Sequence, residues 1–435
     1  MRSGSRKIRT KFTTSSLTHF GGIYLLHQFL QQLRLRTFLS NYLKFPQRNN
    51  HYSTTELLLA LIYPMILGLD KIEVSALLGT NGVFQYITGL PAFPNPTTLR
   101  RFLSRAADPL FEQLASTHDR LRRYFLSASS TSWSFWLDCD STTQTLYGHQ
   151  EGAMVGYNPH HRGKKSYHPS IITEAHRGDC LAGRLRPGNA HTAEGIDDLL
   201  RRATSLLPAI HRLRVRADAG FYSGSFVSLL KELKAEFAVV AHLTSTVRRI
   251  LETRRYARVS SIFSTAEFSY RPHGWKEPER FVVLRRKLPN QEAASQTTLF
   301  TLDRHAYSVV VTNLNLTPYG VFRFYQDRSA MERIVRTLKE DYPLGKAATN
   351  SFQANAFYTE VSLLAYNLIT WFKRMCLPTD WHSFTLPTIR HRLLMIPGEF
   401  VRSHNVPVLR FPKNNPYQNI FEYAQQQIGR LEALI

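Results

Sequence analysis

Three carboxylates occupy positions at which metal-dependent phosphodiester chemistry could be built. Asp140 is the last residue of the first predicted strand, Asp218 directly follows the fourth, and Glu332 lies on a late predicted helix. Two Mg²⁺ ions held by such a set can activate an attacking oxygen and neutralise the leaving one. Magnesium prefers oxygen ligands and keeps part of its water shell, so two aspartates and one glutamate are enough protein ligands. Because aspartate is also a common turn residue, the prediction depends on all three side chains converging.

The segment around Glu332 adds phosphate-binding groups at helical spacing. At about 100° per residue, four side chains fall within about 40° of Glu332 on a continuous helix; they are Tyr325, Arg328, Arg336 and Lys339. An exposed i,i+4 pair between Glu332 and Arg336 would account for part of this pattern. A neighbouring apolar stripe favours a site instead, because its burial would hold the charged face against the protein. The stripe consists of Met331, Ile334, Val335 and Leu338.

The elements that must position these residues form an α/β succession. Three strands come first, and alternation within the first puts Asp138 and Asp140 on one face. The predicted strands span 133–140, 170–176, 180–187, 213–217 and 237–242, and the predicted helices span 192–207 and 225–234. This order is that of an RNase H-like core, in which a mixed sheet is flanked by helices.

The remaining sequence divides into regions around that core. The predicted regions are a helical N-terminal DNA-binding region (1–128), the RNase H-like catalytic domain (129–243 and 321–375), a β-rich insertion (244–320) and a C-terminal tail (376–435). The catalytic domain is expected to resume with a helix over 327–340 and to close with a long apolar helix over about 350–375. The insertion accounts for the large number of residues between Asp218 and Glu332 in the sequence. The tail is predicted to contact DNA or a second subunit.

The composition favours an ordered, soluble protein that binds a polyanion. The 435 residues are 43% hydrophobic, and 55 Lys and Arg against 32 Asp and Glu leave a net charge of +23. Such an excess is unfavourable unless a polyanion is bound, and nucleic acid is the leading partner. The first 50 residues contain nine Lys or Arg and no acid. They fit either an arm that lies on phosphates or a solvated basic tail, attached to a helix over about 17–44.

Several other classes of protein are disfavoured. No run of about 18 apolar residues occurs, so membrane insertion is not expected. The basic start lacks a clean apolar core and a cleavage site, so no signal peptide is expected. The three cysteines are widely spaced without a CxxC, which indicates neither a disulfide framework nor a thiolate zinc site. These features predict a cytoplasmic protein.

Further basic groups are candidates for contact with DNA. The helix expected over 94–106 has a basic face like that of the second helix of a helix-turn-helix, and a plain bundle helix fits equally well. Its basic residues are Arg100, Arg101 and Arg105. A second set is expected to follow the DNA backbone without reading the base sequence. It consists of Arg162, Lys164, Lys165, Arg184 and Arg186.

Trp275 lies at a predicted glycine-bounded turn in the insertion. Its neighbours in the sequence include Arg271, His273, Lys276 and Arg280. An aromatic ring among cations could stack on a flipped or terminal base. Alternatively, the ring packs on its own hairpin.

Four segments resemble those of DDE-type transposases encoded by bacterial insertion sequences; they are DSTTQTLYG (140–148), GYNPHHRGKKSYHP (156–169), LAGRLRPGN (181–189) and RADAGFYS (216–223). The family's Y-x2-R-x3-E-x6-K signature is matched in every spacing by Tyr325, Arg328, Glu332 and Lys339. The similarity extends over about 130–375. It implies a bacterial, nucleoid-associated protein.

The resemblance also implies which carboxylates are catalytic. Asp140, Asp218 and Glu332 would form the metal-binding triad, with two Mg²⁺ ions that Mn²⁺ can replace. Asp140 is preferred to Asp138 because it directly precedes a Ser-Thr pair, as the family's first acid does. Asp138 would then be a supporting or surface carboxylate.

The resemblance assigns the other signature residues to DNA. Tyr325, Arg328 and Lys339 would contact phosphates at the transposon end, and Trp275 would correspond to a tryptophan that relatives use on a base. The implied reaction is cleavage at terminal inverted repeats and strand transfer to target DNA, through a hairpin end and a homodimeric synaptic complex. Two alternatives stay open: an RNase H-like structure-selective nuclease, and a catalytically silent DNA-binding regulator derived from a transposase.

Overall fold

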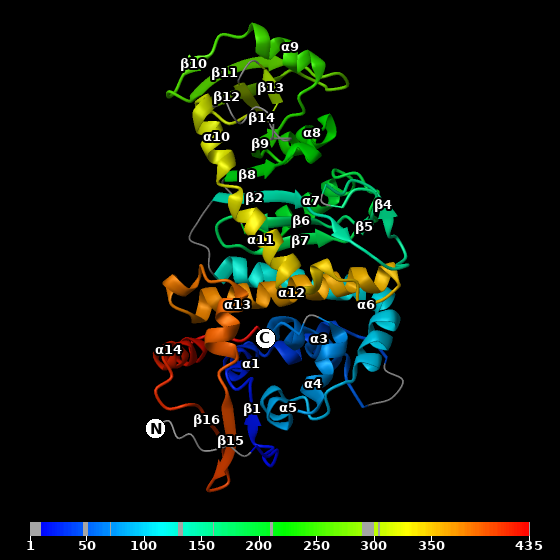
Figure 1. The fold of residues 1–435 in the computed structure, drawn as a ribbon, viewed down its shortest axis with the longest axis vertical. Coiled ribbons are helices and arrows are strands. Elements are labelled where there is room, and N and C mark those ends of the chain that lie inside the picture. The colour runs from blue at the N-terminus through cyan, green and yellow to red at the C-terminus, as the bar shows by residue number, and fades with distance from the viewer. Residues whose placement is uncertain are drawn as a thin grey trace. The chain divides into compact units, whose positions relative to one another are not determined.

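The computed structural model describes residues 10–46, 51–69, 71–128, 134–159, 161–208, 212–288, 300–302 and 305–434. Its chain forms two compact units. The terminal unit combines Met1–Phe102 with Trp371–Ile435, and the central unit comprises Leu103–Thr370. The elements of both units are labelled in Figure 1.

The first part of the terminal unit is helical. Its elements are β1 (Leu17–Thr18), α1 (Ile23–Gln32), α2 (Leu35–Tyr42), α3 (Thr54–Leu67), α4 (Ala76–Gly79) and α5 (Gly82–Thr88). The single helix predicted over 17–44 is therefore wrong. Arg34 adopts a left-handed conformation with φ of 52° and separates α1 from α2. Before α1 the chain passes Gly22, where a Cβ would collide with the carbonyl oxygen of Leu393.

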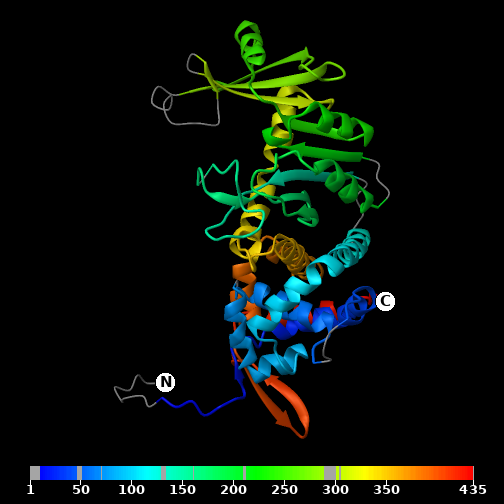
Figure 2. The same cartoon turned by 90° about the vertical axis from the view of Figure 1, so that its right-hand side faces the viewer.

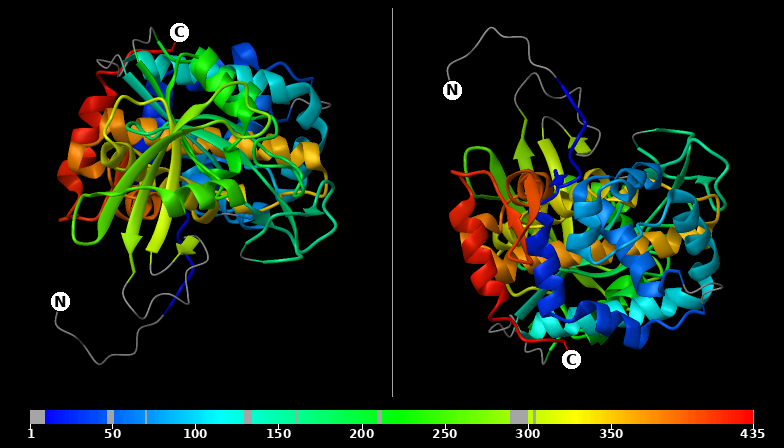
Figure 3. Two further views of the ribbon diagram at one scale, coloured as in Figure 1. Left: turned by 90° about the horizontal axis from the view of Figure 1, so that it is seen from above. Right: turned by 90° about the horizontal axis from the view of Figure 1, so that it is seen from below.

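The C-terminal residues fold onto this first part. They form α13 (Leu386–Ile389), a π-helical turn (Arg390–Leu394), β15 (Gly398–Ser403), β16 (Val406–Arg410) and α14 (Gln418–Ile428). β15 pairs with β1 and with β16 in one small sheet, and α14 contacts α1. Figure 3 shows the C-terminal residues in red and the N-terminal residues in blue. The sequence expected as a basic tail is thus a folded part of the terminal unit.

The central unit contains a mixed sheet with the predicted succession of strands. The first strands are β2 (Ser134–Ser141), β6 (Ser170–Glu174), β7 (Cys180–Arg184), β8 (Arg212–Ala217) and β9 (Glu236–Val240). They lie in the order β7-β6-β2-β8-β9. β2, β8 and β9 run parallel, whereas β6 and β7 are antiparallel to their neighbours. The helices α7 (Ile196–Ser205) and α8 (Gly224–Glu232) bury their apolar sides against one face of these strands.

The insertion extends the same sheet rather than forming a separate one. It contains α9 (Ser245–Thr253), β10 (Ala257–Arg258), β11 (Phe263–Tyr270), β12 (Glu279–Lys287), β13 (Phe300–Leu302) and β14 (His305–Thr312). β14 pairs with β9, and β12 and β11 follow outward (Figure 2). Helix α9 was not predicted; the Thr244 hydroxyl caps it, and Val247 and Leu251 are its buried residues.

Two helices cover the other face of the sheet. They are α10 (Pro318–Gln326) and α11 (Ser329–Glu340), drawn in yellow in Figure 1. Phe324 packs on Trp136 of β2 with ring centroids 4.8 Å apart. Between the helices the chain makes a tight turn, in which Arg328 N–H donates to the Tyr325 carbonyl at 3.0 Å. Because of this turn, Tyr325 and Glu332 do not share one continuous helix.

Two long helices and a small sheet complete the described elements. The predicted helix over 94–106 is the start of α6 (Pro96–Ala128), and the long apolar helix is α12 (Phe352–Cys376). The small sheet comprises β3 (Gln144–Thr145), β4 (Met154–Val155) and β5 (Lys165–Tyr167). Within the described ranges, no helix has the length and hydropathy needed to cross a membrane.

Candidate functional site

Asp140 and Asp218 lie at the carboxyl ends of neighbouring strands. β2 and β8 are parallel, and their register pairs Cys139 with Ala217, so the next residue on each strand is one of these aspartates. Asp140 is buried and Asp218 is half-buried. Burial raises the pKa of the Asp218 carboxyl; the charge of Arg328 opposes this shift and that of Asp140 adds to it. The structure therefore brings two of the three predicted acids together.

The guanidinium of Arg328 lies against this acid pair. Its Nη2 is 3.1 Å from Oδ1 of Asp140 and donates to the Cys139 carbonyl at 2.8 Å. Burial alone would lower the pKa of Arg328, but the charges of Asp140, Tyr325 and Asp218 raise it. Tyr325 is half-buried in the same cluster, and burial raises the pKa of its hydroxyl. Arg328 thus pairs with Asp140 and offsets part of the negative charge of the two acids in this structure.

Asp138 has a different partner from Asp140. Arg216 donates to both of its carboxylate oxygens, at 2.6 and 2.9 Å, and to the carbonyl of Phe324 at 2.8 Å. Both side chains are fully buried. A bidentate contact of this kind is strong and directional. Sequence reasoning assigned no role to Arg216, although its alternation with Asp218 along β8 places it beside the strand end.

Glu332 occupies an exposed position on the first turn of α11. The expected apolar stripe is buried in part: Met331 and Leu338 are fully buried, whereas Ile334 and Val335 are half-buried. The Thr173 hydroxyl donates to the Met331 sulfur at 3.0 Å. Within the described part of the chain, no three His, Cys, Asp or Glu side chains are grouped to hold a metal ion. The assignment of Glu332 as the third acid stays a prediction.

The acidic side chains at the strand ends match a divalent ion in their chemistry but not in their arrangement. The carboxylates of Asp140 and Asp218 are the hard oxygen donors that Mg²⁺ prefers. Their arrangement does not complete a metal site, because Arg328 contacts Asp140 and Glu332 is exposed on α11. The oxygen donors of the two aspartates suit a divalent ion, whereas the conformation in this structure does not bring a complete set of ligands together.

Two histidines near the acids had no predicted role. His242 follows β9, whose carboxyl end lies beside that of β8, and its charge lowers the pKa of Asp218. His168 lies within hydrogen-bond distance of the Ser141 hydroxyl (3.1 Å) and of the Ala190 carbonyl (3.0 Å). Only the parallel pairing of β8 with β9 could have indicated His242, and pairing is not visible in a local pattern.

The predicted backbone-contacting residues fall into two groups. Arg162, Lys164, Lys165 and Arg184 are exposed. Arg186 is buried instead and donates to the main-chain carbonyls of His168, His191, Thr192 and Glu194. Burial lowers its pKa to about 10. The prediction that Arg186 follows the DNA backbone is therefore wrong.

The basic face at the start of α6 is partly engaged within the terminal unit. Arg100 forms an ion pair with Glu73. Arg101 is exposed. A role for either residue in DNA binding stays a prediction.

Trp275 packs beyond its own hairpin. Its ring centroid is 5.1 Å from that of Tyr222, and a Cβ on Gly224 would lie about 3.0 Å from the indole. Tyr222 belongs to the segment that follows Asp218. The indole remains half-buried. The structure thus connects Trp275 to the loop next to the second acid, and base stacking stays a prediction.

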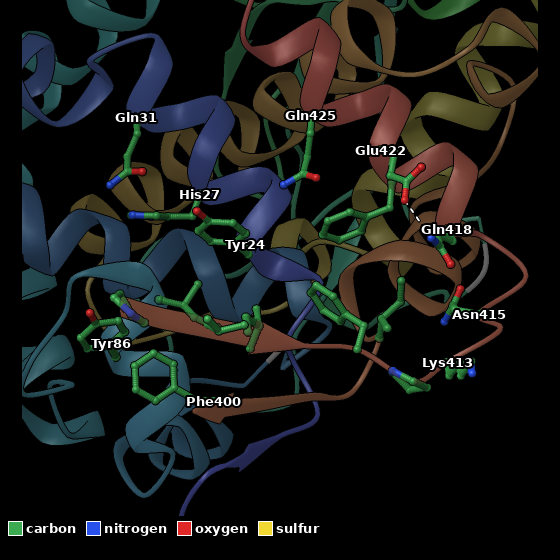
Figure 4. Close-up of a pocket in the computed structure, with 18 of the residues that line it drawn as sticks. Tyr24, His27, Gln31, Tyr86, Phe400, Lys413, Asn415, Gln418, Glu422 and Gln425 are labelled. Atoms are coloured by element: carbon green, nitrogen blue, oxygen red, sulfur yellow. Dashed lines mark hydrogen bonds between the residues drawn. The ribbon is translucent and has the colours of Figure 1, made fainter. Parts of the chain in front are cut away.

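A pocket of about 940 Å³ lies in the terminal unit (Figure 4). Its described lining combines aromatic rings with side-chain amides from α1, α5, β15, β16 and α14. The labelled residues include Tyr24, His27, Gln31, Tyr86, Phe400, Gln418 and Gln425. None of the predicted site residues is among the described lining residues. The pocket is therefore distinct from the acid pair, which belongs to the central unit.

Comparison with known proteins identifies the family. No curated protein matches the sequence. Among solved structures, the chain is similar to a piggyBac transposase in a cryo-EM structure of its synaptic complex with hairpin DNA. That similarity has a TM-score of 0.46 and 9% identity, and covers 86% of this chain and 78% of the other. The family model for the transposase DDE domain, group 1, matches residues 2–433. Because this match extends over nearly the whole sequence, the chain belongs to the DDE transposases.

Proposed function

We propose that this transposase cleaves DNA at the terminal inverted repeats of its element and transfers the freed ends to target DNA. The observation that carries the proposal is the juxtaposition of Asp140 and Asp218 at adjacent parallel strand ends. Carboxylates placed side by side repel each other, so their presence in one partly buried site calls for a function. Such a pair suits phosphodiester cleavage and transesterification.

The strand order supports an RNase H-like catalytic domain. Three strands in antiparallel succession precede two parallel strands that are reached through helices, in the order β7-β6-β2-β8-β9. Ligands of such sheets bind outside the carboxyl ends of the parallel strands. The two aspartates are located at that edge. We assign the insertion at 244–320 and the helix that carries Glu332 to the same domain.

We further propose that catalysis depends on a divalent ion, Mg²⁺ or Mn²⁺. When bound, such an ion would supply charge neutralisation at the scissile phosphate. Asp140 and Asp218 would hold it, and Glu332 would join them after a rearrangement of α11. His168 would keep Ser141 in place beside the first acid.

The DNA partner is inferred from charge. The exposed cations Arg162, Lys164 and Lys165 would neutralise backbone phosphates, and Lys339 and Trp275 would bind close to the transposon end. A hairpin end and a homodimeric synaptic complex, in a bacterial insertion sequence, complete the proposal. Coordinated cutting of two ends favours two catalytic chains.

The test is end cleavage by purified protein on duplexes that carry the inverted repeats flanking its gene. Asp140→Ala, Asp218→Ala and Glu332→Ala should each lower Mg²⁺-dependent cleavage by about 10³-fold or more. Binding of the same duplex should change little. Glu340→Ala is the matched control for Glu332, because both glutamates are exposed on α11. Cleavage by all three variants at the wild-type rate would refute the proposal.

The same assay separates the alternatives. A structure-selective nuclease would cut branched DNA but would not join a pre-cut end to a target plasmid. A catalytically silent regulator would protect the repeats in a footprinting assay without cleaving them. Strand transfer of pre-cut ends by the wild type, and its loss in Asp218→Ala, distinguishes the transposase from both.

A further inference from the structure

Arg328 is buried beside Asp140, which is unusual for a cation that only binds DNA. The residue is 8% exposed. The charges that act on it come from Asp140, Tyr325, Asp218 and Asp138. A positive charge in this position neutralises the same carboxylates that a divalent ion would use.

The contact with Asp140 is weaker than the neighbouring ion pair. Arg216 engages both oxygens of Asp138 through two nitrogens. The Nη2 of Arg328 is 3.1 Å from Oδ1 of Asp140, and the same nitrogen also donates to the Cys139 carbonyl. The buried Nε of Arg328 finds no hydrogen-bond partner among the described residues. A buried guanidinium with an unsatisfied N–H is costly, so this arrangement is suited to exchange.

The backbone around Arg328 places it where movement would matter. It lies in the turn between α10 and α11, and its carbonyl accepts the N–H of Met331 at 2.9 Å. Glu332 follows one residue later, exposed on the first turn of α11. A shift of this turn would move Arg328 and, at the same time, change the direction in which the Glu332 side chain points.

From these contacts we infer that Arg328 is a built-in counter-ion of the DNA-free protein, which competes with divalent cations for Asp140 and Asp218. The inference rests on the proposed function of the two aspartates as metal ligands. It adds a regulatory device: part of the negative charge of the acid pair is offset, and Asp140 is occupied, until the guanidinium moves away. A DNA phosphate has the charge to do so, since guanidinium binds phosphate well.

The experiment measures Mn²⁺ binding without DNA, by calorimetry and by the rise in melting temperature when MnCl₂ replaces EDTA. Arg328→Gln should bind Mn²⁺ at least about tenfold more tightly than the wild type. A neighbouring positive charge shifts the pKa of a carboxyl group by about one unit or more, and we expect a comparable effect on its affinity for a metal cation. In EDTA the variant should melt lower, since the aspartates lose their counter-ion. Mn²⁺ should raise its melting temperature more than it raises that of the wild type.

Arg333→Gln is the matched control. Arg333 is exposed on α11, so its replacement changes the net charge equally without touching the acid pair. Its Mn²⁺ affinity should equal that of the wild type. Adding Asp140→Asn and Asp218→Asn to Arg328→Gln should remove the gained binding. Equal Mn²⁺ affinities for Arg328→Gln and Arg333→Gln would overturn the inference.

A second variant covers a folding failure of Arg328→Gln. Arg328→Met removes the charge but keeps an unbranched side chain, so it should also bind Mn²⁺ more tightly than the wild type; unchanged affinity would overturn the inference. These outcomes are independent of end cleavage. If wild type cleaves ends but Arg328 has no effect on Mn²⁺ binding, only the counter-ion role is lost. If wild type does not cleave ends, the proposed function itself fails.

Discussion

The central unit contains two clusters of buried charge that differ in how completely their groups are paired. The helix cluster joins α6, α7 and α12 through His118, Asp119, Arg122, Arg202, Glu360 and Asn367. The strand-end cluster contains Asp140, Asp218, Tyr325 and Arg328. The first cluster is a connected network, whereas the second leaves the Arg328 Nε without a partner among the described residues.

The pairing in the helix cluster is close throughout. His118 Nδ1 is 2.7 Å from Glu360, and Arg122 donates to Asp119 at 2.8 Å and to the Cys180 carbonyl at 2.9 Å. Burial alone would raise the pKa of Glu360, but Arg122 and His118 lower it to about 2. In the strand-end cluster, burial raises the pKa of Asp218. The contrast teaches that the paired charges of the first cluster hold helices together, whereas the second cluster, in which burial raises the pKa of Asp218, is the one proposed as a functional site.

The largest expected effect is on the helix cluster. Glu360→Ala leaves the buried Arg122 and His118 without their shared acceptor, so unfolding free energy should fall by about 3–5 kcal/mol. Urea unfolding followed by circular dichroism measures this loss. A change below about 1 kcal/mol would mean that the cluster is not structural.

The second effect is on pH dependence. Burial, with the charge of Arg122 second, lowers the pKa of His118 from 6.5 to about 4. Below pH 6.5 the unfolded chain therefore binds a proton that the folded chain does not, and stability falls as pH falls from 6.5 towards 4. Between pH 6.5 and 4, the melting temperature should fall less steeply for His118→Gln than for the wild type. The difference in slope should correspond to the uptake of about one proton on unfolding. Parallel curves for the two proteins would contradict the assignment.

A smaller effect is expected at the strand ends. Since burial disfavours the ionised Asp218, Asp218→Asn should leave unfolding free energy within about 1 kcal/mol of wild type, or raise it. The same substitution should abolish end cleavage. Comparing it with Glu360→Ala in one set of denaturation curves sharpens the distinction between the clusters. A large stability loss for Asp218→Asn would remove that distinction.

The smallest effect is predicted for an exposed pair. Glu232 contacts Arg201 at 2.6 Å, and both side chains are largely exposed. Solvent and salt screen such a pair. Glu232→Ala should melt like the wild type, which makes it the baseline for the other variants.

Local patterns were sufficient for the order of strands and helices from β2 to β9 in the central sheet. Period-2 alternation and apolar runs predicted the strands that became β2, β8 and β9, and helical spacing predicted the buried stripe that includes Met331 and Leu338. These patterns depend on residues a few positions apart. The break at Arg34, the turn at Arg328 and helix α9 were missed, because caps and packing decide where a helix stops.

The sequence by itself determined which residues could do chemistry, since residue type and spacing are properties of the chain. It also determined the family, through motifs that span most of the length. Only the tertiary structure decided the partners: Arg216 for Asp138, Arg328 for Asp140, main-chain carbonyls for Arg186, and the first strand for the last hairpin. Such pairings join residues far apart in the chain, and burial then fixes which charges remain available. A local pattern contains neither the pairing nor the burial.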